Sequence, residues 1–149
     1  MSLTELYSEL ATYPVKGAYV FLCACFSGGY KSAAPLLAQK GVRVVPKVGL
    51  PQGKTLSFSS SSGDQTSSVY HDKKQGYYTY FLIKTIKDAR GDLSMKDLFE
   101  RTSAAVKKAT AMIGKMQEPQ CMVSPTWFGW ESLRLETPVE PAPVAPQGE

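Results

Sequence analysis

The sequence contains no long hydrophobic run. No apolar stretch approaches the ~20 residues that a membrane-spanning helix requires. The opening residues, MSLTELYSEL, carry neither the basic region nor the apolar core of a secretion signal. We therefore expect a cytoplasmic protein without a membrane partner, unless a longer precursor supplies a signal.

Histidine and cysteine are both scarce, with one histidine and three cysteines in 149 residues. A single residue separates Cys23 from Cys25, so a disulfide between them would close a very tight ring, and we expect free thiols in a reducing compartment. Zinc sites typically use four ligands with C-x₂₋₄-C spacing, which makes a metal or redox site of Cys23, Cys25 and Cys121 the weakest interpretation. We expect no metal and no cofactor, and Cys121 as a small buried hydrophobic residue.

The sequence also lacks a basic run interleaved with aromatic residues. Its net charge of +4 comes from lysines scattered along the chain, which is typical of a solvated surface, so no nucleic-acid partner is expected. A length of 149 residues and a hydrophobic fraction of 43% fit one folded domain. Residues 136–149 have proline at nearly every third position and almost nothing to bury, which predicts a disordered tail after a domain over 1–135.

Apolar and β-branched residues mark the strands. The run from Ala18 to Leu22 has no polar alternation and predicts a strand buried on both faces of a parallel sheet. A second strand is predicted over Thr55–Ser60. Further along the chain, 119–125 is predicted to be a short extended piece and 127–135 the last strand.

Three helices accompany these strands. Ser2 and Glu5 form a capping-box pattern that predicts a helix ending before Pro14. Glycines bound a second helix, and Ser94 with Asp97 caps a third. The predicted buried faces are Tyr78, Phe81, Leu82 and Ile86 in the second helix, and Leu98, Thr102, Ala105, Val106, Ala109 and Met112 in the third.

Two of the predicted strands end in segments suited to a functional site. Cys23 and Cys25 follow the first strand and precede a small-residue turn, and the polar loop 61–68 follows the second strand. In open α/β sheets, the crevice beyond the carboxyl ends of the strands carries ligand and catalytic groups. We therefore expect the two ends to lie side by side and to build one crevice.

The segment Cys23-Ala24-Cys25-Phe26-Ser27-Gly28 resembles the nucleophile segment of caspase-like cysteine peptidases, whose metacaspase-like and bacterial members have Asp-Ala-Cys-Phe-Ser-Gly. FSSSSGDQTSS at 58–68 is similar to the strand and Asp-Gln loop that follow in these relatives, and GYYTYFLI at 76–83 is similar to their next helix. The resemblance covers residues 17–125. It implies an α/β fold, a caspase-like sandwich with a mostly parallel sheet flanked by helices, here lacking its amino-terminal strands.

The resemblance assigns roles to individual residues and implies a peptide or protein substrate. Cys25 corresponds to the nucleophile, whose thiolate attacks a peptide carbonyl while its own backbone N–H helps to hold the oxyanion. Asp64 corresponds to an acidic residue of the specificity pocket, which in metacaspase-like members receives Lys or Arg at the cleaved bond. Ser61 and Ser62 are weaker candidates for backbone contacts with the bound peptide.

Two departures from the family pattern bear on activity. The family's catalytic histidine follows an earlier strand that this sequence lacks, and His71 lies where the family has no catalytic residue, so we expect His71 in an exposed loop. Without a base, a thiol with a pKa of ~8.5 is mostly protonated at neutral pH. Cys23 stands in place of an aspartate that helps to recognise a basic side chain, so basic specificity would depend on Asp64 alone and be weakened.

Two functions are compatible with these residues. The first is a caspase-like cysteine endopeptidase that cuts after Lys or Arg, with the long basic connection 30–54 as a self-processing site. The second is a catalytically inactive interaction module or truncated fragment. In both cases the strand 18–22 would present an exposed apolar edge, which we expect to pair with a second copy in a homo-dimer or with a missing upstream half of the domain, or to limit solubility.

Overall fold

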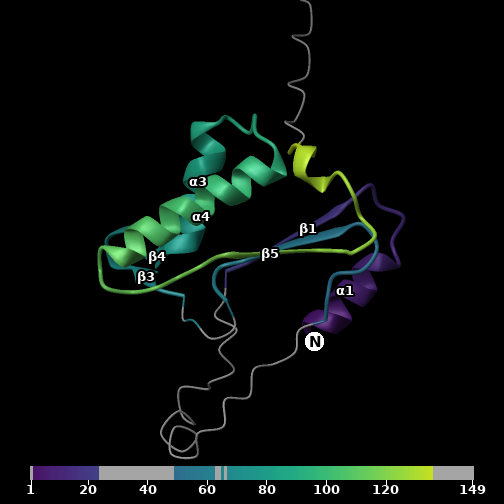
Figure 1. Ribbon diagram of the computed structural model, residues 1–149, viewed down its shortest axis with the longest axis horizontal. Coiled ribbons are helices and arrows are strands. Elements are labelled where there is room, and N and C mark those ends of the chain that lie inside the picture. The colour runs from purple at the N-terminus through teal and green to yellow at the C-terminus, as the bar shows by residue number, and fades with distance from the viewer. Residues whose placement is uncertain (1, 24–48, 63–64, 66, 136–149) are drawn as a thin grey trace, which may run out of the picture.

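A three-stranded sheet lies at the centre of the computed structural model, which describes residues 2–23, 49–62, 65 and 67–135 (Figure 1). The strand order is β1-β2-β5. β1 (Ala18–Leu22) pairs with β2 (Thr55–Ser59) in parallel, and β2 pairs with β5 (Gln120–Val123) in antiparallel orientation. The two strands predicted over 18–22 and 55–60 and the extended piece predicted over 119–125 are confirmed, with β2 one residue shorter than predicted. The middle strand β2 is buried along its whole length.

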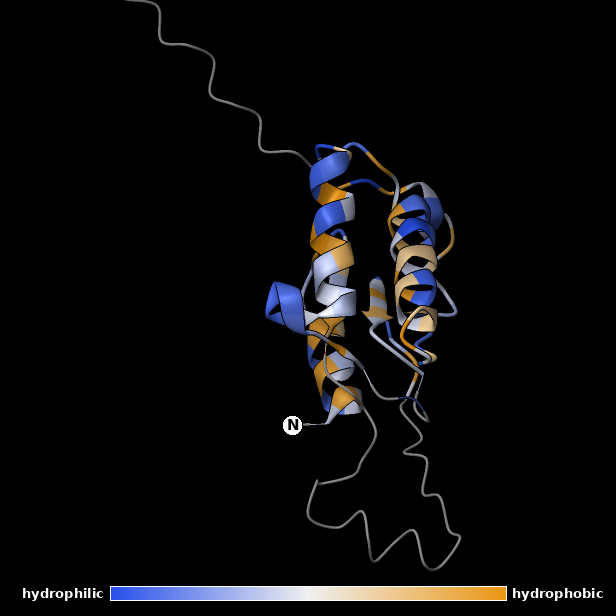
Figure 2. Cartoon of the chain, turned by 90° about the vertical axis from the view of Figure 1, so that its left-hand side faces the viewer, coloured by the Kyte–Doolittle hydropathy of each residue, from blue (hydrophilic) through white to orange (hydrophobic). Residues whose placement is uncertain are grey.

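Helices α3 (Tyr77–Asp88) and α4 (Met95–Ala111) form a layer above one face of the sheet (Figure 1). Leu56 and Phe58 of β2 belong to the core beneath them, and the Phe58 ring centroid lies 5.2 Å from that of Phe99. The other buried core residues are Tyr78, Leu82, Leu93, Met95, Leu98 and Val106. Figure 2 shows hydrophobic and hydrophilic residues alternating along these helices, as expected for helices with one buried face.

Helix α1 (Leu3–Ala11) contacts the sheet at its middle strand, β2. The Tyr7 side chain is fully buried, and its hydroxyl donates a hydrogen bond of 2.8 Å to the Ser57 Oγ. Successive side chains of a strand point to opposite faces, so Ser57 faces away from the core that holds Leu56 and Phe58. The sheet is therefore flanked by helices on both faces.

The predicted helix starts are confirmed. Ser2 and Glu5 form a complete capping box at α1, and the Ser94 Oγ accepts a hydrogen bond of 3.1 Å from the Asp97 N–H at α4. After α3, Gly91 adopts a φ of 76° and its N–H donates to the Ile86 carbonyl, which ends the helix as predicted.

The predicted buried face of the third helix is right except at its end. Leu98, Thr102 and Val106 are buried, whereas Met112 is 82% exposed. Thr110 takes the next buried position because it continues the four-residue spacing of that face. Met112 would lie about 200° round the helix axis from Thr110, on the opposite side of the helix, because a helix has 3.6 residues per turn. Moreover, α4 already ends at Ala111.

The strand predicted over 127–135 is wrong. The structure has a short 3₁₀ helix, η2 (Trp130–Ser132), preceded by Gly129 with a φ of 78°, and a single bridge joins Ser94 to Arg134. Trp130 and Leu133 pack against the core, so the aromatic and apolar residues there serve a covering loop. A two-stranded hairpin of β3 (Val69–Tyr70) and β4 (Gln75–Gly76), with η1 (His71–Lys73) between them, was not predicted.

The prediction that Ala18–Leu22 is buried on both faces is also wrong, because all five residues are only half-buried. Within the described residues β1 pairs with β2 alone and lies at an edge of the sheet. Its apolar sequence therefore belongs to an edge strand, in agreement with the expected exposed edge. Most of the connection 30–54 and the tail 136–149 lie outside the described residues, and no helix in the described ranges is long and apolar enough to span a bilayer.

The hydrogen bond between Tyr7 and Ser57 yields a stability prediction. Tyr7→Phe leaves the fully buried Ser57 hydroxyl without its partner, and we expect the free energy of unfolding to fall by about 1–3 kcal/mol. The matched control, Tyr13→Phe, changes an exposed ring and should stay within about 0.5 kcal/mol of the wild type. Urea denaturation measures both, and equal effects of the two substitutions would contradict the prediction.

Candidate functional site

The carboxyl ends of β1 and β2 lie side by side. Leu22 pairs in register with Ser59, and the Ser60 N–H donates a hydrogen bond of 2.9 Å to the Leu22 carbonyl. The parallel pairing therefore brings the residues that follow Leu22 next to those that follow Ser59. The predicted juxtaposition of the two strand ends is confirmed.

Three of the predicted site residues belong to the described structure. Cys23 is an exposed free thiol directly after β1, Ser61 is buried and Ser62 is half-buried. Cys25 and Asp64 lie outside the described residues. Each of them comes two residues after the last described residue of its segment, Cys25 after Cys23 and Asp64 after Ser62.

His71 occupies the first position of η1, in the hairpin between β3 and β4, and is exposed. This position agrees with the expected exposed loop residue. The hairpin that contains it leads directly into α3, whose N-cap is Gly76, and the Tyr77 N–H at the start of α3 donates to the Ser68 carbonyl.

Serine hydroxyls join the two sides of the loop after β2. The Ser61 Oγ donates to the Gln65 carbonyl at 3.3 Å, and the Oγ atoms of Ser60 and Ser67 lie 2.5 Å apart. The Ser59 Oγ donates to the Ser61 carbonyl at 3.3 Å. The serine-rich sequence thus satisfies its own buried polar groups, which allows a polar loop to begin inside the structure.

Gln117 joins both ends of this loop and was not identified from the sequence. Its Nε2 donates to the Ser60 carbonyl at 2.9 Å, and its Oε1 accepts from the Ser68 N–H at 2.9 Å. The side chain is 1% exposed. A glutamine in an extended segment beside a predicted strand is a weak signal in the sequence, because a buried amide needs partners that the sequence does not name.

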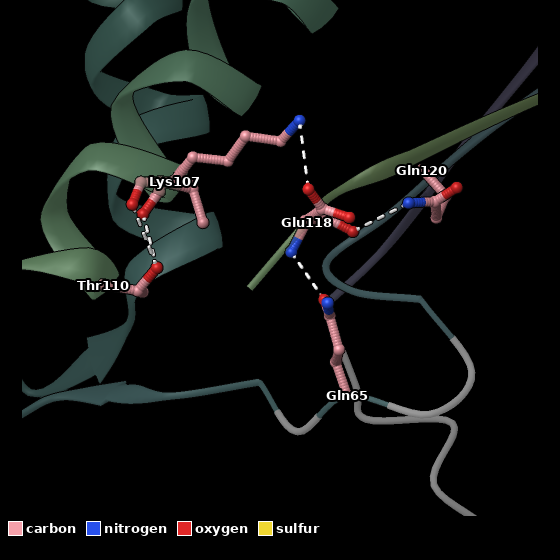
Figure 3. A network of polar contacts seen from close by, with 6 residues as sticks. Gln65, Lys107, Thr110, Glu118 and Gln120 are labelled. Atoms are coloured by element: carbon pink, nitrogen blue, oxygen red, sulfur yellow. Dashed lines mark hydrogen bonds and ion pairs between the residues drawn. The ribbon is translucent and has the colours of Figure 1, made fainter. Parts of the chain in front are cut away.

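Gln65 makes a second connection from the middle of the loop (Figure 3). Its Oε1 accepts a hydrogen bond of 2.7 Å from the Glu118 N–H. The Glu118 carboxylate lies 3.5 Å from the Lys107 Nζ of α4, and the Glu118 carbonyl accepts from the Gln120 Nε2 at 3.0 Å. The ion pair is half-exposed and contributes little stability, so the backbone hydrogen bond is the stronger connection.

The two described thiols differ in exposure, since Cys23 is exposed and Cys121 is half-buried. Burial raises the pKa of Cys121 to about 11, and the nearby Glu131 carboxylate adds to the increase. Burial also raises the pKa of the Tyr78 hydroxyl, with smaller contributions from Cys23 and Cys121. Cys121 packs against the core and stays protonated at neutral pH, as expected of a small hydrophobic residue and not of a nucleophile.

Among the described residues no group of three or more His, Cys, Asp and Glu side chains could hold a metal ion.

Comparison with known families decides the class of the protein. A family model of the caspase domain matches residues 1–126. This chain belongs to the caspase domain family. A comparison with curated proteins gives no significant match. The helix-flanked sheet agrees with a caspase domain, and the family consists of cysteine peptidases, whose substrates are proteins.

The raised pKa of Cys121 predicts a pH dependence for the stability of this caspase domain. The unfolded thiol titrates near its ordinary value of 9.0 and the folded thiol near 11, so the folded state holds a proton that the unfolded state has lost between these values. Stability is therefore fully present below about pH 9 and falls as the pH rises towards 11. Tyr78 acts in the same direction at higher pH.

We expect Cys121→Ala to reduce the loss of stability between pH 9 and pH 11, because the titrating thiol is removed. The matched control is Cys23→Ala, which removes an exposed thiol and should keep the decline of the wild type. Urea denaturation at several pH values measures the decline. A decline of equal size in Cys121→Ala and in the wild type would contradict the assigned cause.

Proposed function

We propose that this caspase domain is the nucleophile-bearing part of a cysteine endopeptidase that cuts peptide bonds after Lys or Arg. The observation that supports the proposal best is the pairing of the two strand ends through the Ser60 N–H and the Leu22 carbonyl. In the sequence, Cys25 lies three residues after Leu22, and Asp64 four residues after Ser60. A nucleophile and an anionic recognition group that belong to these two ends would act on one bound peptide.

The proposed reaction proceeds through an acyl-enzyme. The Cys25 thiolate attacks the carbonyl carbon of the substrate, and the Cys25 N–H stabilises the resulting oxyanion. The C–N bond then breaks and the amine leaves with a proton. Water hydrolyses the thioester, which gives a carboxylate and regenerates the thiol.

The reaction also requires a base that accepts the proton of the Cys25 thiol. His71, the only histidine of this sequence, lies exposed in η1 of the hairpin. We therefore assign the base to a group outside this sequence, supplied by an upstream half of the domain or by a partner. The chain alone is then weakly active or inactive, since an unactivated thiol is mostly protonated at neutral pH.

Recognition of the substrate involves Asp64, Cys23 and the backbone near Ser61 and Ser62. Asp64 would pair with the cation of Lys or Arg. Cys23 is exposed at the end of β1, where a metacaspase-like relative carries a carboxylate, and a neutral thiol offers no charge to the same cation. The Ser61 Oγ already donates within the loop, so Ser61 would contact a peptide through its backbone.

The second candidate function is a catalytically inactive interaction module. The open edge of β1 within the described residues supports it, because an apolar edge strand readily pairs with a further strand. That strand would come from a second copy of the chain or from an upstream half of the domain. An inactive module predicts no reaction of Cys25 with a peptidyl electrophile near neutral pH.

The nucleophile is tested with a fluorogenic peptide that ends in Arg or Lys. We expect Cys25→Ala to reduce hydrolysis to the background of the buffer, because no acyl-enzyme can form. Cys121→Ala is the matched control and should retain the rate of the wild type, since this thiol is protonated and packed against the core. Equal rates in the wild type and in Cys25→Ala would show that this chain alone has no activity through Cys25 and would favour the inactive interaction module.

The role of Cys23 in specificity is tested by restoring a charge. We expect Cys23→Asp to raise the preference for an arginyl over a neutral substrate by about tenfold or more, the effect of one charge-assisted hydrogen bond. Cys23→Asn has a similar size without the charge and should leave the preference near that of the wild type. The readout is the ratio of kcat/KM for the two substrates, and an equal rise in both variants would argue against a charge effect.

A further inference from the structure

We infer that Gln117 is a positioning residue that sets the place of the substrate-recognition loop relative to the nucleophile strand. This inference rests on the proposed function, because it gives the loop after β2 its role in recognition. Gln117 acts through its hydrogen bonds to Ser60 and Ser68, neither of which is proposed to contact the substrate.

The Gln117 amide bridges the neck of the loop, which consists of Ser60 and Ser68. Its two hydrogen bonds, each 2.9 Å long, join the Ser60 carbonyl on one side of the loop to the Ser68 N–H on the other. Residues 61–67 lie between these two points in the sequence. One side chain therefore fixes the entry and the exit of the whole loop.

The neck is also connected to the rest of the fold on both sides. The Ser60 N–H donates to the Leu22 carbonyl of β1, and the Ser68 carbonyl accepts a hydrogen bond of 3.1 Å from the Tyr77 N–H at the start of α3. A shift of the Ser60–Ser68 pair would thus change the position of the loop relative to the end of β1. Because Cys23 and Cys25 follow β1, the same shift would change the geometry of recognition.

An amide satisfies both partners at this position at any pH. Glutamine supplies a donor and an acceptor at the end of one side chain, as the Ser60 carbonyl and the Ser68 N–H require. In Gln117→Glu, only the protonated carboxyl could donate to the Ser60 carbonyl, because an ionised carboxylate would be an unpaired charge in a site that is 1% exposed. In Gln117→Leu, both hydrogen bonds are lost while the volume is nearly kept.

The experiment measures labelling of Cys25 by two peptidyl acyloxymethyl ketones, one ending in arginine and one in norleucine. In the labelling step the thiolate displaces the acyloxy group as a carboxylate and forms a thioether. Peptide mapping with fragmentation distinguishes Cys25 from Cys23, which lies in the same tryptic peptide. Labelling by iodoacetamide reports the reactivity of the thiol without any recognition of a side chain.

We expect Gln117→Leu to lower the arginine-over-norleucine ratio of labelling efficiency by about tenfold, equivalent to about 1.4 kcal/mol. The loss should appear as weaker binding of the arginyl probe at an unchanged maximal rate, with iodoacetamide labelling within about twofold of the wild type. Gln120→Leu is the matched control. Gln120 lies three residues further along the same segment, and within the described residues its side chain donates to the Glu118 carbonyl and not to Ser60 or Ser68, so the ratio should not change.

Each outcome decides one point. A wild-type ratio preserved in Gln117→Leu, with the variant folded by circular dichroism, would overturn the positioning role. A parallel loss of iodoacetamide labelling would also overturn it, since the thiol itself would then be disturbed. If the wild type labels Cys25 without any preference for arginine, the proposed function fails before Gln117 is considered, and the inference fails with it.

Discussion

Ser60 carries the hydrogen bonds on which the geometry of the candidate site depends. Its N–H donates to the Leu22 carbonyl of β1, and its carbonyl accepts from the Gln117 Nε2. Through these two bonds, Ser60 connects three segments: the end of β1, the exit of β2, and the segment that leads into β5. Because Ser60 is fully buried, water cannot replace either partner, and the three segments keep one relative position.

The two faces of β2 explain why this point is rigid. Phe58 packs against Phe99 of α4 on one face, and Ser57 accepts the Tyr7 hydroxyl of α1 on the other. The middle strand is thereby held between helices on both faces, and the residues that follow it start from a fixed position. A recognition loop that starts from such a strand needs only a closed neck to be held in place, which the Gln117 amide supplies.

Local patterns in the sequence predicted local structure well. The capping box of Ser2, the cap at Ser94 and the strands at Ala18–Leu22 and Thr55–Ser59 follow from interactions within a few residues, and they are found where predicted. The errors arise where packing partners decide the outcome. Residues 127–135 have the composition of a strand, but Gly129 with its positive φ turns the chain into a 3₁₀ helix, and Trp130 and Leu133 pack against the core as part of a covering loop.

The sequence alone determined the family resemblance, the candidate nucleophile Cys25, the candidate recognition residue Asp64 and the departure at Cys23, because these depend on residue type and order along a short segment. The sequence also predicted that the two strand ends lie side by side and that the strand 18–22 presents an edge, and both are found within the described residues. Only the tertiary structure decided that Gln117 joins the two ends of the loop. The reason is distance along the chain. Gln117 bonds to residues 57 and 49 positions away, and no local pattern encodes which buried carbonyl and N–H an amide will find.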